Sequence, residues 1–378
     1  MSGKVRLGNI IKTAKIEKCG ENDLPVLSMT MHNGILLQKD RFKKSLASVD
    51  KSNYKIVKKG QLVVGFPIDE GVLYIQNIID KGIMSPAYNV WNVDTQLVDL
   101  QFLEYSLHSP SSMKYYASHL RGTTARRRSL PTETLLALPL TIPDMENQKK
   151  VVRNLQKLND VIELRNKQLE KLDLLVKSRF IEMFGDEFIE VTADSVCSKI
   201  VDCPHSTPQY NEDSLIYPAI RTSEIHNGKI KWSTMKYVGS KEYEKRIKRL
   251  KPLPGDIVYA REGTYGDCVI LPRGFEFCLG QRTMLFRPDF SICNSEYLHT
   301  VLRSEFVKKQ ADKSNAGSTV PHVNVADAKQ FRFPLPPIEL QNQFADFVEQ
   351  VDKSKLAIQQ SLEKLETLKK SLMQEYFG

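Results

Sequence analysis

Two long stretches of the chain carry apolar residues at alternating steps of four and three, the spacing of helices that pack along a narrow seam. Every seventh residue is apolar from Leu155 to Met183, and again from Phe344 to Leu372. One amphipathic helix lying on its own domain would explain a single stretch, but two near-equal seams pack more simply on each other. The predicted helix–helix seam comprises Leu155, Ile162, Leu169, Val176, Val351, Ile358, Leu365 and Leu372.

The regions before these stretches consist of short β-rich runs separated by Gly, Pro and Asn turns. Examples are QLVVGFPI from Gln61, DIVYA from Asp256 and TMLFRP from Thr283. Short strands with such punctuation favour a compact α+β or mostly-β domain over alternating βαβ units. One amphipathic helix is expected in each region, around residues 100–119 and 295–313.

The sequence also repeats itself. Gly60 aligns with Gly255, Gly122 with Gly317, Pro139-Leu140 with Pro334-Leu335 and Asn147-Gln148 with Asn342-Gln343, each 195 residues apart. The Phe-Gly pairs that end the two helical stretches lie 193 residues apart. A period of this length indicates two tandem copies of a domain-sized module. The predicted parts are a first module at 1–142, a central helical region at 143–185, a second module at 186–336 and a C-terminal helical region at 337–378.

Composition fits this plan and narrows the class of protein. The 378 residues are 41% hydrophobic and 26% charged, which suits two or three globular domains. No apolar run reaches membrane-spanning length and the N-terminal stretch lacks a signal-peptide core, so we expect a cytoplasmic protein without membrane contact. The net charge of +9 favours a polyanionic partner, although solubility alone explains similar charge in many proteins.

Motifs of catalysis are missing from the sequence. There is no GxxxxGK[ST] loop, no GxGxxG after a strand, no HExxH and no GxSxG elbow. The six cysteines form no CxxC pair, so they are expected to be reduced thiols, and no metal site is predicted. The absence of these motifs favours a binding or scaffolding protein without catalytic residues over an enzyme.

Polar and basic loops occupy equivalent places in the two copies. Small hydroxyl residues can bond phosphates, while Arg and Asn can read guanine and adenine edges. Caps made by Ser and Thr beside solvated arginines would explain the same composition. The candidate DNA-binding residues of these loops are Thr123, Thr124, Arg126, Arg127 and Arg128 in the first copy, and Ser318, Thr319, His322 and Asn324 in the second.

The second copy has two more turn-rich strand ends with suitable side chains. The candidates there are Arg261, Thr264, Tyr265, Gln281 and Arg282. Their glycines serve a hairpin as readily as a close DNA approach. The first copy has FPIDEG from Phe66 at the equivalent place, with different chemistry, as expected if the modules read different things. The basic stretch KEYEKRIKRLK from Lys241 is either a solvated helix face or a phosphate-tracking helix.

The repeated punctuation resembles the specificity subunit of type I restriction–modification enzymes. The motifs that carry the resemblance are LPLTIPDMENQ from Leu138 and FPLPPIELQNQ from Phe333, with MFGD and EYFG at the helix ends. The stretches LPGDIV from Leu253 and DCPHSTP from Asp202 are similar to that family's recognition modules. Thr141-Ile142 departs from the Pro-Pro expected in the first copy.

The resemblance implies an α+β fold with two pseudo-twofold-related target recognition domains, at 1–142 and 186–336, separated by two long antiparallel coiled-coil helices. It implies double-stranded DNA, two methyltransferase subunits and restriction subunits as partners. S-adenosylmethionine, ATP and Mg²⁺ would bind those partner subunits, with no cofactor in this chain. His205 and Ser206 join the candidate DNA-binding residues on this resemblance.

A heptad run of about thirty residues spans roughly 45 Å, a little more than one turn of B-DNA at ~34–36 Å. The expected target is therefore two unlike half-sites split by an unread spacer. Two other hypotheses remain: a coiled-coil scaffold whose modules bind proteins, and an enzyme with an unrecognised site.

Overall fold

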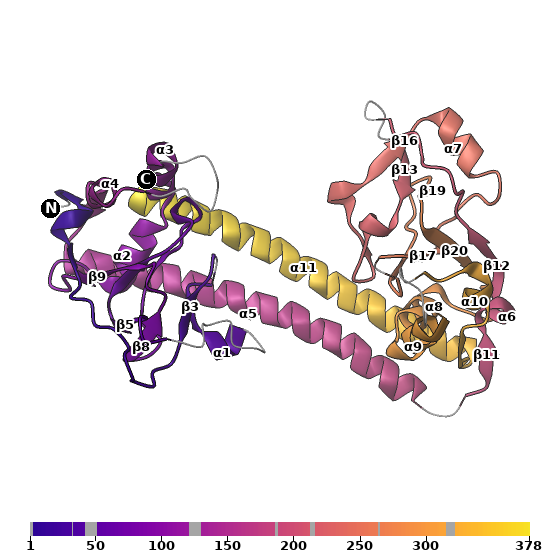
Figure 1. Ribbon diagram of the computed structural model, residues 1–378. Coiled ribbons are helices and arrows are strands. Elements are labelled where there is room, and N and C mark those ends of the chain that lie inside the picture. The colour runs from indigo at the N-terminus through magenta and orange to yellow at the C-terminus, as the bar shows by residue number, and fades with distance from the viewer. Residues whose placement is uncertain are drawn as a thin grey trace. The chain divides into compact units, whose positions relative to one another are not determined.

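The chain is seen in a computed structural model that describes residues 3–31, 33–41, 51–120, 130–185, 188–211, 216–263, 265–314 and 322–378 (Figure 1). It divides into two compact units, unit 1 with Met1–Lys167 and Gln359–Gly378, and unit 2 with Gln168–Ile358. Each unit holds one module together with one part of each long helix. Both modules mix sheets with helices, so the predicted α+β class is confirmed.

A four-stranded antiparallel sheet forms the centre of the first module. Its strand order is β2-β9-β6-β7. Every residue of its strands β6 and β7 is buried, because alternate side chains enter two different apolar clusters. Leu62 and Leu73 belong to one cluster, and Val63 and Tyr74 belong to the other. The elements of unit 1 are β1 (Gly3–Arg6), η1 (Leu7–Asn9), β2 (Ile11–Thr13), β3 (Leu27–Met29), β4 (Ile35–Leu37), α1 (Gln38–Arg41), β5 (Lys55–Lys58), β6 (Leu62–Val64), η2 (Ile68–Glu70), β7 (Leu73–Ile75), β8 (Lys81–Met84), β9 (Asn89–Val93), α2 (Leu100–Leu107), α3 (Pro110–His119), α4 (Thr132–Leu136), β10 (Pro139–Ile142) and parts of α5 (Met145–Phe184) and α11 (Ile338–Phe377).

The second module repeats this sheet with the order β12-β20-β17-β18 and adds a three-stranded sheet, β16-β13-β19. Alternate residues again divide between two clusters, Ile257 and Tyr259 in one, Val258 and Ala260 in the other. The elements of unit 2 besides the helix parts are β11 (Glu190–Thr192), α6 (Ala193–Val196), β12 (Cys197–Asp202), β13 (Tyr217–Ile220), η4 (Thr222–Glu224), β14 (Ile225–His226), β15 (Lys229–Ile230), η5 (Trp232–Thr234), β16 (Lys236–Val238), α7 (Ser240–Arg246), β17 (Ile257–Ala260), β18 (Cys268–Ile270), β19 (Cys278–Leu279), β20 (Thr283–Pro288), α8 (Ser295–Leu302), α9 (Glu305–Ser314), α10 (Val325–Lys329) and β21 (Arg332–Pro334).

The prediction of a single amphipathic helix in each module is wrong. Two short helices occupy each place, α2 and α3 in the first module and α8 and α9 in the second. Ser109 caps α3 by accepting a hydrogen bond from the Ser112 backbone N–H, and Pro110 follows at the first helical position. Proline at that position favours a helix start and cannot continue the helix before it. In the second module the Ser304 hydroxyl accepts from Val307 N at 3.3 Å at the start of α9. Both breaks are therefore made by a serine cap.

The two copies keep an offset of 195 residues only as far as this second short helix. β6 and β17 begin at Leu62 and Ile257, and α3 and α9 also start 195 residues apart. From α4 and α10 onward the offset is 193, and α5 and α11 begin at Met145 and Ile338. The alignments of Pro139 with Pro334 and of Asn147-Gln148 with Asn342-Gln343 are therefore wrong by two residues. The Gly122–Gly317 alignment lies outside the described residues.

A buried glutamine joins the start of the long helix to the first module. The Gln148 side chain accepts a hydrogen bond from the Asp99 backbone N–H at 2.8 Å. It donates to Leu97 O at 3.1 Å and to Pro143 O at 2.8 Å. Since Asp99 is the N-cap of α2, the first turn of α5 is fixed to the start of that helix.

Gln341 repeats each of these contacts in unit 2. It accepts from Asn294 N at 2.8 Å and donates to Ile292 O at 3.0 Å and to Pro336 O at 2.8 Å. Asn294 caps α8 as Asp99 caps α2. The Gln148 and Gln341 side chains are both almost fully buried. The punctuation repeated in the sequence is therefore a joint, in which a glutamine five residues after a proline ties helix to module.

The end of each long helix packs on the module of the other copy. In unit 1 the ring of Phe377, at the end of α11, lies 5.1 Å from Phe102 of α2, and Ser111 Oγ donates to Phe377 O at 2.6 Å. In unit 2 Phe184, at the end of α5, packs against Tyr297 of α8 at 5.0 Å. Phe102 and Tyr297 hold the same place in the two modules. Each module is thus covered by the start of one long helix and the end of the other.

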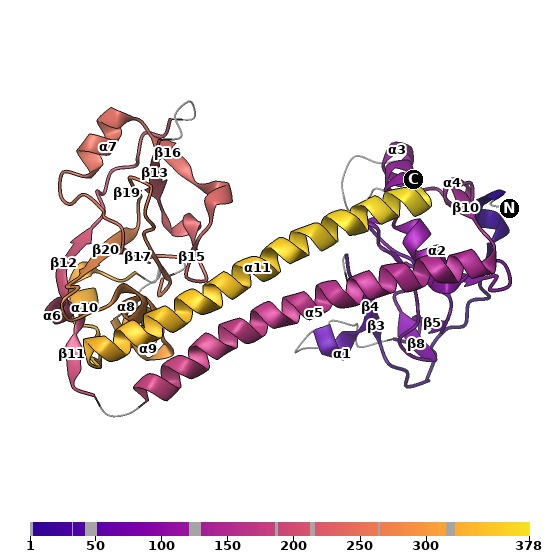
Figure 2. The ribbon, with the colours of Figure 1, turned by 180° about the vertical axis from the view of Figure 1, so that it is seen from behind.

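The long helices contact each other within each unit. In unit 2 Asp173 pairs with Lys355 at 2.7 Å, and further along α5 Phe184 lies 5.4 Å from Phe344, so the two segments run antiparallel there. In unit 1 Asn154 donates to the Tyr376 hydroxyl at 3.3 Å. Each of the two long helices is drawn as one unbroken coil (Figure 2). Each contains 40 residues, which exceeds the heptad run of the sequence.

The predicted seam residues are all buried or half-buried. Leu155, Ile162 and Val351 are buried. The half-buried members are Leu169, Val176, Ile358, Leu365 and Leu372. Their pairing along one continuous seam stays a prediction.

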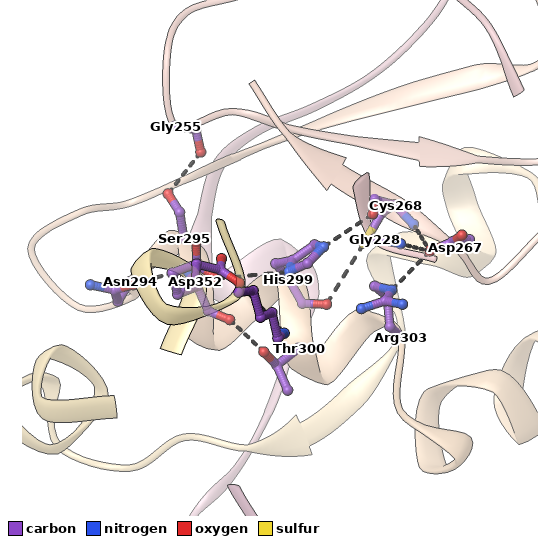
Figure 3. A network of polar contacts seen from close by, with 12 residues as sticks. Gly228, Gly255, Asp267, Cys268, Asn294, Ser295, His299, Thr300, Arg303 and Asp352 are labelled. Carbon is purple, nitrogen blue, oxygen red and sulfur yellow. Dashed lines mark hydrogen bonds and ion pairs between the residues drawn. The ribbon is translucent and has the colours of Figure 1, made fainter. Parts of the chain in front are cut away.

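Helix α8 is fixed to its sheet by a polar network (Figure 3). Asp267 Oδ1 accepts from Arg303 Nε at 2.8 Å and from Gly228 N at 3.0 Å. Burial, with the nearby Arg303 charge, lowers the pKa of His299 to about 4, so its ring is neutral near pH 7. Its Nε2 lies 3.1 Å from Cys268 O, which can only accept, so the proton is on Nε2. The network is thus structural.

The cysteines are reduced, as the sequence predicts. All six cysteines are free, and burial raises the pKa of Cys293 and Cys278 to about 12, which keeps these thiols protonated and unreactive. Among the helices of the described residues, none has the length and apolar character needed to cross a bilayer.

Candidate functional site

Several of the residues predicted to bind DNA gather around one cavity of the second module. The cavity has a volume of about 410 Å³ and lies where the segments at the ends of β12, β17 and β20 meet the segment before α10. We name this region the second tip. It is lined by Cys203, Pro204, His205, Arg261, Glu262, Gln281, Arg282 and His322.

Arg261 lies at the centre of the second tip and only 6% of it is exposed. Its guanidinium pairs with Asp202, donates from Nε to Val323 O at 2.8 Å and reaches His322 Nε2 at 2.7 Å. These bonds join β12, β17 and the segment before α10. The geometry favours a positioning role for Arg261, because a side chain buried and bonded in this way is not presented to a ligand.

A series of hydrogen bonds and ion pairs, which we call the relay, leads from Arg261 through His322 and Glu262 to the exposed Arg282. Arg261 can only donate, so His322 Nε2 accepts and His322 Nδ1 carries the proton. That Nδ1–H donates to Glu262 Oε1 at 3.1 Å. Glu262 Oε2 in turn lies 3.0 Å from Nε of Arg282, whose side chain is 66% exposed. Two carboxylates and two guanidinium groups alternate along the relay, which balances the buried charge.

His205 and Gln281 form the rim of the cavity. His205 is exposed and lies 3.6 Å from Asp202 Oδ2, while Gln281 donates to Thr207 Oγ1 at 2.9 Å. Ser206 is exposed, and its carbonyl accepts a hydrogen bond from Arg246. These side chains have the donors and acceptors that base edges and phosphates require.

Two other candidates lie away from the cavity lining. Tyr265 donates its hydroxyl to Asp312 Oδ1 at 2.5 Å. Asn324 is the N-cap of α10, where it accepts from Asp327 N at 2.8 Å and donates to Asp327 Oδ2 at 2.6 Å. Asn324 therefore caps a helix, a role that the sequence had suggested only for Ser and Thr. Outside the described residues lie Thr123, Thr124, Arg126, Arg127, Arg128, Thr264, Ser318 and Thr319.

The basic stretch from Lys241 contains a residue that cannot track phosphates. Arg246 is buried, and it donates to Glu242 Oε1 at 2.9 Å, to Leu279 O at 2.9 Å and to the Ser206 carbonyl. It therefore holds α7 to β19 and to the loop that carries His205. The helix itself ends at Arg246, well before the end of the basic stretch.

The first module has different chemistry at the equivalent place. With the offset of 195 that β6 and β17 share, Phe66 corresponds to Arg261 and Ala87 to Arg282. Phe66 is 48% exposed and its ring lies 6.3 Å from that of Tyr88. Met31 is also exposed. We name Phe66 and Tyr88 the first tip, which is aromatic where the second tip is charged.

Sequence reasoning missed the acidic half of the second tip. Asp202 and Glu262 hold Arg261, His322 and Arg282 in place, yet neither was among the candidate DNA-binding residues. One signal was available, since Asp202 ends a strand-like run and Glu262 follows Arg261 directly. Among the described residues no group of three His, Cys, Asp or Glu side chains could hold a metal ion.

Two α+β modules with one scaffold, different tips and a shared helix joint define a duplicated recognition protein. The model of the type I restriction modification DNA specificity domain matches residues 3–174 and again residues 206–369. The chain therefore belongs to that family, as a specificity subunit with two recognition domains.

Known proteins agree with this assignment. The MjaVIII type I restriction enzyme specificity subunit of Methanocaldococcus jannaschii is 24% identical over 315 residues, 78% of this chain and 73% of that one. The HindI specificity subunit of Haemophilus influenzae is 25% identical over 134 residues, 35% of this chain and 29% of that one.

Solved structures share the fold. A chain from a study of complex assembly and conformational transition of the type I R-M system matches with a TM-score of 0.62 and 16% identity, covering 100% of this chain and 97% of that chain. The type I restriction–modification S subunit from M. genitalium matches with a TM-score of 0.57 and 13% identity, covering 100% and 96%.

Proposed function

We propose that this chain reads a two-part double-stranded DNA target, with one half-site for each recognition module. The observation that carries the proposal is the duplicated scaffold with unlike tips. The sheets and the glutamine joints repeat in both copies. Where the second module has Arg261, Glu262 and Arg282, the first has Phe66, Pro67 and Ala87 at the equivalent positions. Duplicated readers with different contact chemistry suit two different half-sites, and the net charge of +9 suits a polyanion.

The chain is further proposed to act without chemistry of its own. Two methyltransferase subunits would dock on the long helices, and restriction subunits would complete a cytoplasmic complex. S-adenosylmethionine, ATP and Mg²⁺ would bind those partners. The long helices expose several large apolar side chains on which a partner could pack. Those with the largest exposed fractions are Leu164 in unit 1 and Leu174, Ile181 and Leu356 in unit 2.

One observation favours a second candidate function, a scaffold whose modules bind proteins. The first module exposes Phe66 at its tip and also Met31, which are residue types enriched at protein interfaces. An apolar tip also suits the methyl group of thymine, however, so it does not by itself exclude DNA.

Footprinting separates these candidates. The chain, with the methyltransferase subunit of its host, is incubated with DNA carrying the methylated motif found by sequencing the modified genome. We expect two protected patches with an exposed gap. Protection of neither patch, together with capture of the chain by a protein partner through the first tip, would support the scaffold instead.

Two controls complete the experiment. The isolated chain is titrated with S-adenosylmethionine, and no heat of binding is expected because the cofactor belongs to the partner; binding would favour an enzyme. The double variant Ile162→Asp, Ile358→Asp introduces charge at the seam and should abolish spaced protection while each module still folds. Spaced protection that survives the double variant would contradict the use of the helices as a spacer.

A further inference from the structure

We propose that Arg282 is a guanine-reading residue of the second module and that Glu262 positions it. This inference rests on the proposed function, DNA reading, and names a chemical target for one tip. It is carried by three features of the described residues: the backbone conformation of Arg282, the bonding of its guanidinium, and the cavity beside it.

The backbone at Arg282 is in a conformation that glycine adopts more easily. Its φ is 63°, and among the described residues other than glycine only Asn227 shares a positive φ. An arginine there is strained, and such strain is typical of positions whose side chain is needed. The strand ladder fixes the turn, because Arg261 N donates to Arg282 O at 2.9 Å and Thr283 begins β20. The sheet therefore presents Arg282 at its end.

Glu262 fixes the direction of the Arg282 side chain. The Glu262 carboxylate lies 3.0 Å from Nε, on the side edge of a guanidinium whose side chain is 66% exposed, so this pair does not occupy the end edge, which has one N–H from each terminal amino group. Glu262 is itself held by His322, and His322 by the buried Arg261. A guanidinium oriented before binding loses less conformational freedom when it meets its ligand. The relay therefore supports a rigid fork at the rim of the cavity.

The chemistry of this fork points to guanine. Two parallel N–H donors match the O6 and N7 acceptors that guanine presents in the major groove. A phosphate would also accept from arginine. It would, however, bring a second negative charge close to Glu262, which already borders the cavity. A neutral base edge avoids that repulsion, so the arrangement favours a base over the backbone.

The test compares the methylated motif of cells that carry the chain and its methyltransferase partner. Arg282→Gly is the main variant, because glycine removes the side chain and relieves the strain at φ 63°. We expect the wild-type half-site of the second module to contain a guanine, and the variant to accept other bases at that one position. Affinity for the original site should fall about 10- to 100-fold, as for loss of a bidentate base contact.

Further variants separate positioning from contact. Glu262→Gln should relax the same position less strongly, and Arg282→Lys should retain part of the preference because it keeps a donor without the fork. Arg273→Ala removes another exposed arginine of the second module and should leave the motif unchanged. The melting temperature of Arg282→Gly should equal or exceed that of the wild type. This result would separate a loss of base recognition from misfolding.

The outcomes distinguish a base contact of Arg282 from a phosphate contact and from no DNA contact. An unchanged motif with uniformly weaker binding and a smaller salt dependence would show a phosphate contact and overturn the inference. An unchanged motif with unchanged affinity would show that Arg282 touches no DNA. If the wild-type chain and its partner bind no spaced sequence at all, the proposed function fails, and this result is distinct from the other two.

Discussion

The two recognition modules share a scaffold and differ at the tips. In the second module a buried arginine and two carboxylates form a relay that ends at the exposed Arg282. In the first module Phe66 and Tyr88 occupy the same ends of the same strands, without counterparts of Arg261 or Glu262. The framework of β6 and β17 therefore tolerates either chemistry, because the strands below the tip are buried among apolar side chains in both. The two modules therefore share an apolar core below tips of different chemistry.

The largest difference is expected when each tip loses its central residue. Arg261→Ala leaves the mostly buried Asp202 carboxylate with only the exposed His205 at 3.6 Å, so unit 2 should lose about 3 kcal/mol of unfolding free energy. Phe66→Ala removes a half-exposed ring and should change unit 1 by less than about 1 kcal/mol. Hydrogen exchange measured unit by unit reports both changes. Similar losses in the two units would contradict the view that only the second tip is built on a buried charge.

The glutamine joints should behave alike in the two copies. Gln148→Ala and Gln341→Ala each remove three hydrogen bonds at a buried place and strand an amide N–H of a helix cap, so each should cost its unit about 2 kcal/mol. The matched control is Gln343→Ala, whose side chain is exposed on α11 and which should change stability by less than ~0.5 kcal/mol. Unfolding in urea with a probe in each unit measures the effect. A neutral Gln341→Ala would show that the joint is not needed in unit 2.

These joints also show how far sequence comparison reaches. The strands, both long helices and the duplication follow from apolar periodicity and from Gly and Pro punctuation. The pairing of Gln148 with Gln343 came from identical letters, Asn-Gln, and was wrong by two residues. What the fold needs is a glutamine five residues after Pro143 or Pro336, since that spacing carries the side chain back to the carbonyl of the proline.

The second tip was only partly predictable. His205, Arg261, Gln281, Arg282 and His322 were all candidates, and they do line one cavity. Which of these side chains is exposed and which is buried depends on how four separate segments pack, and no local pattern encodes that. The burial of Arg261 and its pairing with Asp202 arise from that packing. The DNA contacts of these residues stay predictions.

A smaller difference concerns pH. Burial, and then the nearby Asp352 charge, raise the pKa of Glu296 from 4.5 to about 7, and the neutral His299 at 3.9 Å does not offset this. The first module has Gln101 at the equivalent position of α2. The folded state binds more protons than the unfolded state between about pH 4.5 and 7, so unit 2 loses stability as pH rises through that window.

The matching variant is Glu296→Gln, which makes the second module resemble the first. Because 35% of the side chain is reached by solvent, the effect is screened and should amount to about 1 kcal/mol. Unfolding of unit 2 at pH 5 and pH 7 should differ less in the variant than in the wild type. An unaltered pH dependence would assign the slope to another group.

The smallest expected effect distinguishes the helix parts of the two units. Lys355 is 8% exposed and pairs with Asp173 at 2.7 Å and Asp352 at 3.5 Å, whereas Ile162 holds the same place along α5 in unit 1. Both carboxylates stay largely solvated when the lysine is removed, since 64% of the Asp173 side chain and 50% of the Asp352 side chain are exposed, and methionine keeps the apolar contacts of the buried lysine stem. Lys355→Met should therefore change the unfolding free energy of unit 2 by between zero and about +1 kcal/mol. Urea unfolding measures it, with Lys353→Met on the exposed face of α11 as control. A clear loss of stability would mean that the two units differ in what holds their helices together, and that the lysine in unit 2 supplies stability that Ile162 obtains by apolar packing.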